Sequence, residues 1–298
     1  MKDTFQQVVD ATSDWSVEIT PKMAKSIENF SDLLPLNTTV NVTSLPGEDT
    51  AETVNVSERL FNDGMHPVPH IAARSTIDRN TLDNFLHALV DRASVDEVLV
   101  IGGGVSKPVG EFDDTMSILK SGLLQKHGIK KVGIAGHPEG SPDITEEKLQ
   151  EALDEKNNFA KSGQLDLYVE TQICYDSKVI LNWEKDIREK GNELPIRIGI
   201  PGPANIKTLL RFAKLVGMGN SIKFLARQAR NISKLMSIQS PDNLLSGLSE
   251  GISRDPECLI QNFHFYSFGG LDKTAMYANS IANGQFLILP SGEFSIKD

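Results

Sequence analysis

One carboxylate lies inside a short apolar stretch near the amino terminus of the chain. Glu18 interrupts residues 15–20, which are predicted to form a strand that stops at Pro21. A glutamate held in a closed, water-poor site has its pKa raised by desolvation, which suits a general acid near neutral pH. The pattern alone equally allows an outward-facing or salt-bridged glutamate, so Glu18 is a candidate acid.

Three contiguous glycines follow a continuous apolar stretch. Residues 98–101 are all apolar and do not alternate with polar residues, which is typical of a strand buried on both faces of a parallel sheet. Gly102, Gly103 and Gly104 then let the backbone approach a ligand closely or adopt positive φ. A dinucleotide fingerprint needs another glycine three residues later, and Pro108 interrupts the expected helix start. We therefore predict a ligand loop of a different α/β fold.

These residues belong to a regular alternation of expected strands and helices. Eight units without a linker between them predict a parallel sheet closed into a barrel. The predicted fold class is α/β, a (βα)8 TIM barrel in a single domain (residues 1–298) without a regulatory domain; an open doubly wound sheet is the alternative. The expected strands are residues 15–20, 38–43, 68–73, 98–101, 131–135, 165–170, 196–200 and 262–268. The expected helices are residues 23–34, 49–62, 78–89, 114–125, 146–160, 177–189, 206–215 and 271–281, with an extra helical segment at 222–236 and 242–251 before the last strand.

In a barrel of this kind, the carboxyl ends of the strands form the active site. Few strongly cationic groups lie there, and the histidines and the two cysteines lack the spacing of a metal site. The residues at the expected strand ends are Glu18, Thr43, His70 with Arg74, Gly102 to Gly104, Gly136 with His137, Gln172, Pro201 with Gly202, and Tyr266.

The composition is that of an ordinary globular protein. The chain has 298 residues, of which 39% are hydrophobic and 23% charged, and its net charge is −10. An acidic chain without a block of lysine and arginine is a poor partner for nucleic acid or an anionic membrane. No signal core or membrane-spanning apolar run is evident, and Cys174 and Cys258 are expected to be free thiols. We expect a soluble, cytoplasmic homo-oligomer.

Eight short motifs follow one another along the expected strands and the segments after them. They are Val17-Glu-Ile-Thr-Pro21, Val40-Asn-Val-Thr43, Pro69-His70, His137-Pro-Glu-Gly-Ser-Pro-Asp143, Lys156, Thr171-Gln-Ile-Cys-Tyr-Asp176, Ile200-Pro-Gly202 and Phe263-His-Phe-Tyr266. Each motif is weak alone, and their order makes a resemblance specific. From Val17 to about Ala282 the chain resembles the methylenetetrahydrofolate reductases, FAD-dependent (βα)8-barrel enzymes of one-carbon metabolism and methionine biosynthesis.

The resemblance implies ring opening followed by hydride transfer. Glu18 would be the general acid that helps to open the five-membered ring of methylenetetrahydrofolate, which gives an iminium ion. A hydride from N5 of reduced FAD would then reach that carbon and give 5-methyltetrahydrofolate.

The resemblance also implies which residues bind the cofactor and the substrate. On the sequence alone, Lys156 lies in a helix rich in Glu and Lys, where a lysine is more often simply solvated. Gln172 could likewise be a hydrogen-bonded polar residue of the core. His264 is expected to be structural. The positions that correspond to flavin contacts are Thr43, His70, Gly102, Gly103, Gly104, Ala135, His137 and Lys156, with Lys156 as the phosphate partner; Gln172, Ile206 and Tyr266 correspond to the substrate and nicotinamide pocket.

The chain departs from the family pattern at its ligand loops. Gly102 and Gly104 stand where an arginine and an aspartate are usual, and Ile206 replaces a stacking phenylalanine. Gly270 replaces an arginine, and Ser141 replaces a histidine. Loss of the carboxylate beside the flavin removes repulsion against the anionic reduced form, so the flavin potential should rise. A change of ~1.4 kcal/mol corresponds to about 30 mV for a two-electron couple.

These departures leave open whether NAD(P)H is the electron donor. We hypothesise a divergent reductase whose electron partner is not free NAD(P)H, or which works in the direction of methyltetrahydrofolate oxidation. A barrel that binds a different flavin or a partner subunit, without folate activity, is the alternative; retention of Glu18 argues against it. A dinucleotide-dependent dehydrogenase on an open sheet would need the glycines to cradle a pyrophosphate at a helix start, which Pro108 disfavours.

Overall fold

Eight strands of the protein close into a barrel. The computed structural model describes residues 3–44, 47, 49–215, 222, 225–226 and 237–296. The strands are hydrogen-bonded in the order β1-β10-β7-β6-β5-β4-β3-β2. The paired strands from β1 to β5 run parallel, and so do β7 and β10. The predicted α/β barrel is confirmed.

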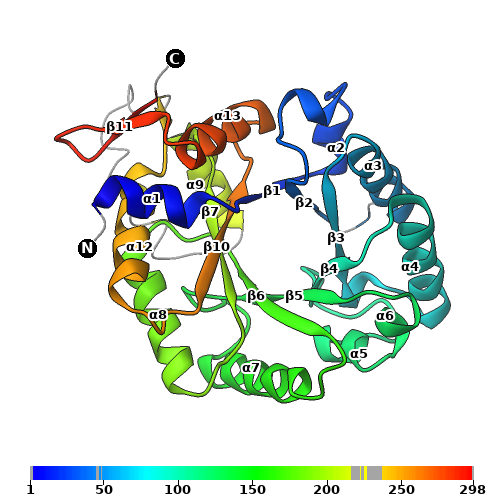
Figure 1. Cartoon of the computed structure of the whole chain (residues 1–298). Coiled ribbons are helices and arrows are strands. Elements are labelled where there is room, and N and C mark those ends of the chain that lie inside the picture. Colours follow the sequence, from blue (N-terminus) through cyan, green and yellow to red (C-terminus); the bar gives the residue numbers. More distant parts are fainter. Residues whose placement is uncertain are drawn as a thin grey trace. The chain divides into compact units, whose positions relative to one another are not determined.

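One compact unit comprises residues 16–135 and 156–170, and we call it the β1–β6 unit. Its helices α3 and α4 pack against each other (Figure 1). The unit contains β1 (Ser16–Ile19), β2 (Thr39–Val42), β3 (His66–Ala72), β4 (Glu97–Ile101), and all but the last residue of β5 (Lys131–Gly136) and of β6 (Asp166–Thr171). Its helices are α2 (Pro21–Ala24), α3 (Thr50–Asn62), α4 (Arg79–Ala93), α5 (Thr115–Leu119) and α6 (Leu123–Lys126).

Local sequence signals set the ends of these helices. The side chain of Asp49 accepts a hydrogen bond from the Ala51 N–H at the start of α3, and Asp78 does the same for Thr81 in α4. Ser94 ends α4 in the left-handed conformation, with φ of 49°. These caps fix where α3 and α4 begin and where α4 ends.

The second compact unit comprises residues 1–15, 136–155 and 171–298, and we call it the β7–β10 unit. Helix α1 packs on α12 and α13, and α7 (Glu146–Ala160) begins in this unit and ends in the β1–β6 unit. Its strands are β7 (Ile196–Pro201), β8 (Ala204–Asn205), β9 (Ile238–Gln239), β10 (Ile260–Tyr266), β11 (Phe286–Ile288) and β12 (Phe294–Ile296). Its other helices are α1 (Thr4–Thr12), α8 (Ser177–Glu189), α9 (Ile206–Leu215), α12 (Asp242–Arg254) and α13 (Leu271–Ala282).

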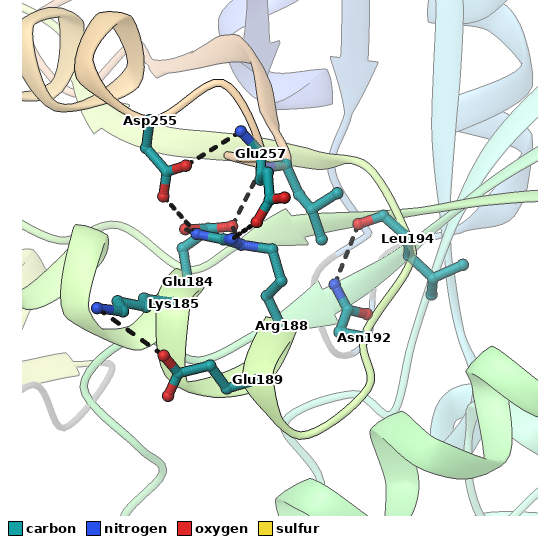
Figure 2. A network of polar contacts seen from close by, with 9 residues as sticks. Glu184, Lys185, Arg188, Glu189, Asn192, Leu194, Asp255 and Glu257 are labelled. Carbon is teal, nitrogen blue, oxygen red and sulfur yellow. Dashed lines mark hydrogen bonds and ion pairs between the residues drawn. The ribbon is translucent and has the colours of Figure 1, made fainter.

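An ion-pair network ties α8 to the segment before β10. Figure 2 shows Arg188 among three carboxylates: Nε lies 2.9 Å from Glu184 Oε1, and the two terminal nitrogens reach Asp255 and Glu257. Glu184 is buried and also accepts a hydrogen bond from the Leu259 N–H at 3.0 Å. Every charge at the centre of this network therefore has an opposite charge in contact.

Two predicted helices are wrong as single elements. The predicted helix 23–34 stops at Ala24, because the guanidinium of Arg59 takes the carbonyl oxygens of Ala24 and Ile27 that a longer helix would use. The predicted helix 114–125 is divided into α5 and α6 by Gly122, which has φ of 73°. A side-chain contact in the first place, and a glycine with positive φ in the second, override a helical apolar pattern.

Other predictions meet the structure in part. The predicted segment 242–251 is confirmed as α12, and both cysteines are free. Apart from residues 222 and 225–226, the predicted helix 222–236 lies outside the described residues. Helix α1 and the β11–β12 hairpin were not predicted. Within the described ranges, no helix combines the length and the apolar character needed to cross a bilayer. The single-domain organisation and the homo-oligomer stay predictions.

Candidate active site

Glu18 lies in the middle of β1 and does not face the surrounding water. Its neighbours Val17 and Ile19 are fully buried, whereas the Glu18 side chain is 17% exposed. Its Oε2 lies 3.7 Å from Nε2 of His70 on β3. Burial, and after it the negative charge of Glu170, raises the pKa of Glu18 from 4.5 to about 8. The outward-facing alternative is therefore excluded, and this carboxyl holds its proton at neutral pH.

Two residues that the sequence reasoning missed complete this cluster. Asn41 on β2 donates a hydrogen bond from Nδ2 to Oε1 of Glu170 on β6 at 2.6 Å. The same Nδ2 lies 3.4 Å from Nε2 of His70. Because β3, β4 and β5 separate β2 from β6 in the sheet, the bond between Asn41 and Glu170 spans the barrel interior. We call Glu18, Asn41, His70 and Glu170 the acid cluster.

A sequence signal for the two missed residues exists. Asn41 stands between Val40 and Val42, and Glu170 follows Val169; these three valines are fully buried. A polar residue at every second position of an otherwise apolar strand marks the face opposite to the helices. The same argument that selected Glu18 would have selected Asn41 and Glu170.

A second polar group occupies the amino ends of three strands in the same unit. Glu97, the first residue of β4, lies 3.3 Å from His66 Nε2 at the start of β3 and 3.5 Å from Lys131 Nζ at the start of β5. Glu97 is buried but is matched by a cation. Polar residues at the amino face of a barrel serve stability rather than chemistry. Substitution of Glu97 is therefore a suitable control for substitutions in the acid cluster.

The glycine loop after β4 has room above its backbone. Gly103 has φ of 91°, and a Cβ there would lie 3.3 Å from the Cβ of Ala72. A Cβ at Gly102 or Gly104 would meet nothing within 4 Å. The backbone therefore requires glycine at position 103, whereas positions 102 and 104 could carry the arginine and aspartate that the resembled family has.

Three other predicted cofactor residues lie in the β1–β6 unit. Thr43 follows β2, its N–H donates to the Ile19 carbonyl at 3.0 Å, and it is buried. Among the described residues, its hydroxyl oxygen Oγ1 has no hydrogen-bond partner. Ala135 on β5 and Lys156 on α7 are half-buried. A buried hydroxyl without a protein partner is suited to hydrogen-bond the polar edge of a ligand.

The other predicted residues lie in the β7–β10 unit, where Tyr266 contacts the backbone beside Gln172. The Tyr266 hydroxyl donates to the Thr171 carbonyl at 3.2 Å, next to Gln172, whose own N–H donates to Gly136 O at 2.8 Å. His137 is half-buried after β5. Ile206 is 1% exposed, so its side chain belongs to the core around the start of α9.

An aromatic stack near Tyr266 was also missed. Tyr266 stacks on Phe268 with ring centroids 5.5 Å apart, and Phe268 stacks on Phe212 at 4.0 Å. Gly199 on β7 makes room for this arrangement, because a Cβ there would lie 2.7 Å from Tyr266 Cε2. A planar ligand ring could extend such a stack.

One solved structure shares the barrel fold at low sequence identity. No family model matches the sequence. One similar solved structure is described as an uncharacterized protein from Clostridium thermocellum that binds two copies of 5-methyl-5,6,7,8-tetrahydrofolic acid; it is 13% identical, 93% of this chain and 96% of that chain are covered, and the TM-score is 0.54. A sugar phosphate isomerase/epimerase from Parabacteroides distasonis is 12% identical over 83% of this chain and 96% of that chain, with a TM-score of 0.35. The first likeness shows a shared barrel fold and no more, and the second is too distant to add to it.

Proposed function

We propose that the protein binds a reduced folate and interconverts 5,10-methylenetetrahydrofolate and 5-methyltetrahydrofolate with the help of FAD, as a divergent relative of the methylenetetrahydrofolate reductases. The observation that carries the proposal is Glu18, a carboxyl in the barrel interior whose pKa is raised to about 8 by burial and by Glu170. A carboxylic acid that stays protonated at neutral pH is suited to protonate a ring nitrogen. The ordered motifs of the sequence give the substrate class.

Glu18 would act on the folate in both directions. Its Oε–H would donate a proton to a nitrogen of the five-membered ring of methylenetetrahydrofolate, which cleaves the carbon–nitrogen bond and leaves an iminium carbon. In the opposite direction the carboxylate would take the proton back as the ring closes. A pKa near neutral pH is the best compromise for a group that must do both.

Folate as the ligand has support from one structural neighbour. That neighbour, with the same barrel fold and a TM-score of 0.54, is described as binding 5-methyl-5,6,7,8-tetrahydrofolic acid. Gln172 and Tyr266 of this chain, joined through Thr171, would bind the substrate beside the stack of Phe268 and Phe212.

FAD is the cofactor that fits the residues of the β1–β6 unit. The open backbone at Gly102 and Gly104 and the buried, unpaired Thr43 hydroxyl would accommodate a flavin, with His70, Ala135 and Lys156 as further contacts from this unit. When bound, the flavin supplies or accepts the hydride. The residues of the chain would hold the ring in place and exclude water from the folate carbon.

The electron partner would be something other than free NAD(P)H. Ile206 is in the core and Gly270 carries no side chain, so neither offers the stacking or cationic contact that is usual in the resembled family. The absence of a carboxylate at Gly104 favours the reduced, anionic flavin. Together these features favour methyltetrahydrofolate as the compound that reduces the cofactor.

Anaerobic mixing of the purified protein tests the proposal. The FAD-loaded protein is mixed in turn with NADH, NADPH and methyltetrahydrofolate, and flavin absorbance is followed. Bleaching by methyltetrahydrofolate is the expected result. Formation of methylenetetrahydrofolate, which needs the proton transfer at ring closure, should be lost in Glu18→Gln and kept in the matched variant Glu97→Gln. Rapid bleaching by NADH and none by methyltetrahydrofolate would reject the proposed direction. A colourless protein that binds methyltetrahydrofolate but cannot take up FAD would indicate a folate-binding barrel instead.

A further inference from the structure

The second carboxylate of the acid cluster, Glu170, has so far entered only through its charge, which raises the pKa of Glu18. Glu170 is 3% exposed, and Asn41 is fully buried. A buried carboxylate is costly unless its oxygens accept hydrogen bonds. The bond from Asn41 Nδ2 to Glu170 Oε1, at 2.6 Å, is therefore expected to be strong, and it fixes how the Asn41 amide is oriented.

The orientation of Asn41 determines what His70 can do. An ionised carboxylate only accepts hydrogen bonds, so the Asn41 atom that faces Glu170 must be the amide nitrogen. The same nitrogen has a second hydrogen, and it lies 3.4 Å from His70 Nε2. Asn41 Oδ1, in contrast, is buried without a hydrogen-bond partner among the described residues. His70 Nε2 thus faces a donor and must itself be an acceptor.

An accepting Nε2 means a neutral imidazole with its proton on Nδ1. An imidazolium would place a second N–H against the N–H of Asn41. A neutral His70 puts no positive charge 3.7 Å from Glu18, where a cation would stabilise the carboxylate and lower its pKa. A neutral His70 therefore leaves in place the preference for the protonated carboxyl that burial and Glu170 give to Glu18.

We propose that Glu170 is a positioning residue: through Asn41 it holds His70 as the neutral Nδ1–H tautomer, and this keeps Glu18 protonated. The inference rests on the proposed function for the role of Glu18 as an acid, but not for the tautomer itself. Groups that face His70 include Glu18 from β1, Asn41 from β2 and, beyond it, Glu170 from β6. On β4 and β5, Glu97 and Lys131 pair with each other.

Nitrogen NMR of the histidine rings tests the tautomer without any turnover. The protein is labelled with 15N in its histidines, and the His70 signals are identified as those missing in His70→Gln. In the wild type at pH 7, Nε2 is expected at the position of an unprotonated ring nitrogen and Nδ1 at that of a protonated one. A proton on Nε2, in the other tautomer or in an imidazolium, would overturn the inference without any variant.

Two substitutions of Glu170 separate hydrogen bonding from charge. Glu170→Met removes the acceptor, so Asn41 can turn its Oδ1 toward His70 and the proton is expected to move to Nε2. Glu170→Gln keeps an acceptor for Asn41, so the wild-type tautomer is expected to persist. Glu97→Gln is the matched control, which should change the signals of His66 and leave those of His70 unchanged. A wild-type tautomer in folded Glu170→Met would overturn the inference.

Failure of the inference and failure of the proposed function have different signatures. The predicted tautomer together with unimpaired folate turnover in Glu18→Gln would reject the function and leave the hydrogen-bond chain standing. A proton on Nε2 in the wild type, together with an inactive Glu18→Gln, would reject the inference alone. Where both hold, turnover at pH 7 should fall more in Glu170→Met than in Glu170→Gln.

Discussion

Two glutamates largely shielded from water, one in each compact unit, occupy opposite electrostatic environments. Glu184 on α8 is 2% exposed, contacts Arg188 at 2.9 Å and accepts a further hydrogen bond from Leu259. Glu18 on β1 lies 3.7 Å from His70, and the charge of Glu170 adds to the cost of ionising it.

The difference separates a structural carboxylate from a reactive one. Glu184 gains an arginine as it loses water, and the carboxylates of Glu184 and Asp255 raise the guanidinium pKa of Arg188 above its usual value, so Arg188 stays a cation. Glu18 loses water and meets a second carboxylate, so it is pushed toward the protonated form. Carboxyl groups of the second kind are the ones that transfer protons near neutral pH.

The largest expected effect is on turnover. Glu18→Gln should lower the rate of methyltetrahydrofolate oxidation by about 10²–10⁴-fold, because an amide cannot exchange the proton that general acid–base catalysis requires. The FAD content and the unfolding midpoint should be unchanged or higher. Steady-state assays with a folate substrate measure the loss, with Glu97→Gln as the control. Turnover within a few-fold of the wild type would remove Glu18 from this role.

The next largest effect is on stability. Glu184→Ala should reduce the free energy of unfolding by about 3 kcal/mol, because it leaves Arg188 and the Leu259 N–H without their buried partner. Turnover per folded molecule should stay at the wild-type value. Urea unfolding and a turnover assay on the same preparation check both statements. A fall in turnover that exceeds the unfolded fraction would show that Glu184 is not purely structural.

The pH dependence of stability gives the third prediction. Between pH 4.5 and about 8 the folded protein keeps on Glu18 a proton that the unfolded chain has lost. The contribution of Glu18 to stability therefore falls by roughly 1.4 kcal/mol for each pH unit in this window and levels off above it. In urea unfolding, the free energy of unfolding of Glu18→Gln should rise relative to that of the wild type as the pH goes from 5 to 8. A difference in free energy that stays constant over this range would contradict the raised pKa.

The smallest effect belongs to the rim of the ion-pair network. Glu257 is 85% exposed and lies 3.4 Å from Arg188, so water already solvates most of its charge. Glu257→Gln should leave the free energy of unfolding within about 0.5 kcal/mol of the wild type. A loss as large as that of Glu184→Ala would mean that burial does not distinguish the members of the network.

Much of the architecture could be predicted from the sequence because it depends on local patterns. Eight apolar strands that alternate with segments of helical apolar spacing predicted the barrel. Glu18 was selected because it is a polar residue in an otherwise apolar strand. The predicted helix 23–34 failed because Arg59, from another element, takes its carbonyl groups. An apolar pattern records which face is buried but not which distant side chain competes for the backbone.

The acid cluster was predicted only in part, since its contacts join distant positions. Asn41 and Glu170 are 129 residues apart, and their bond depends on the closure of the sheet. Likewise, the sequence shows glycine at positions 102 to 104 but not that only Gly103 has a backbone that requires it. Such contacts depend on the closed sheet and on backbone conformation, which no single stretch of sequence determines.

The most direct test of the central claim, a protonated Glu18 in the barrel interior, is infrared titration of its carboxyl group. Difference spectra between pH 6 and pH 9 report the groups that lose a proton in this range, and a wild-type spectrum compared with Glu18→Gln isolates one of them. A protonated-carboxyl band that disappears near pH 8 in the wild type and is missing in the variant is the predicted result. A Glu18 carboxyl that is already ionised at pH 6 would contradict the claim.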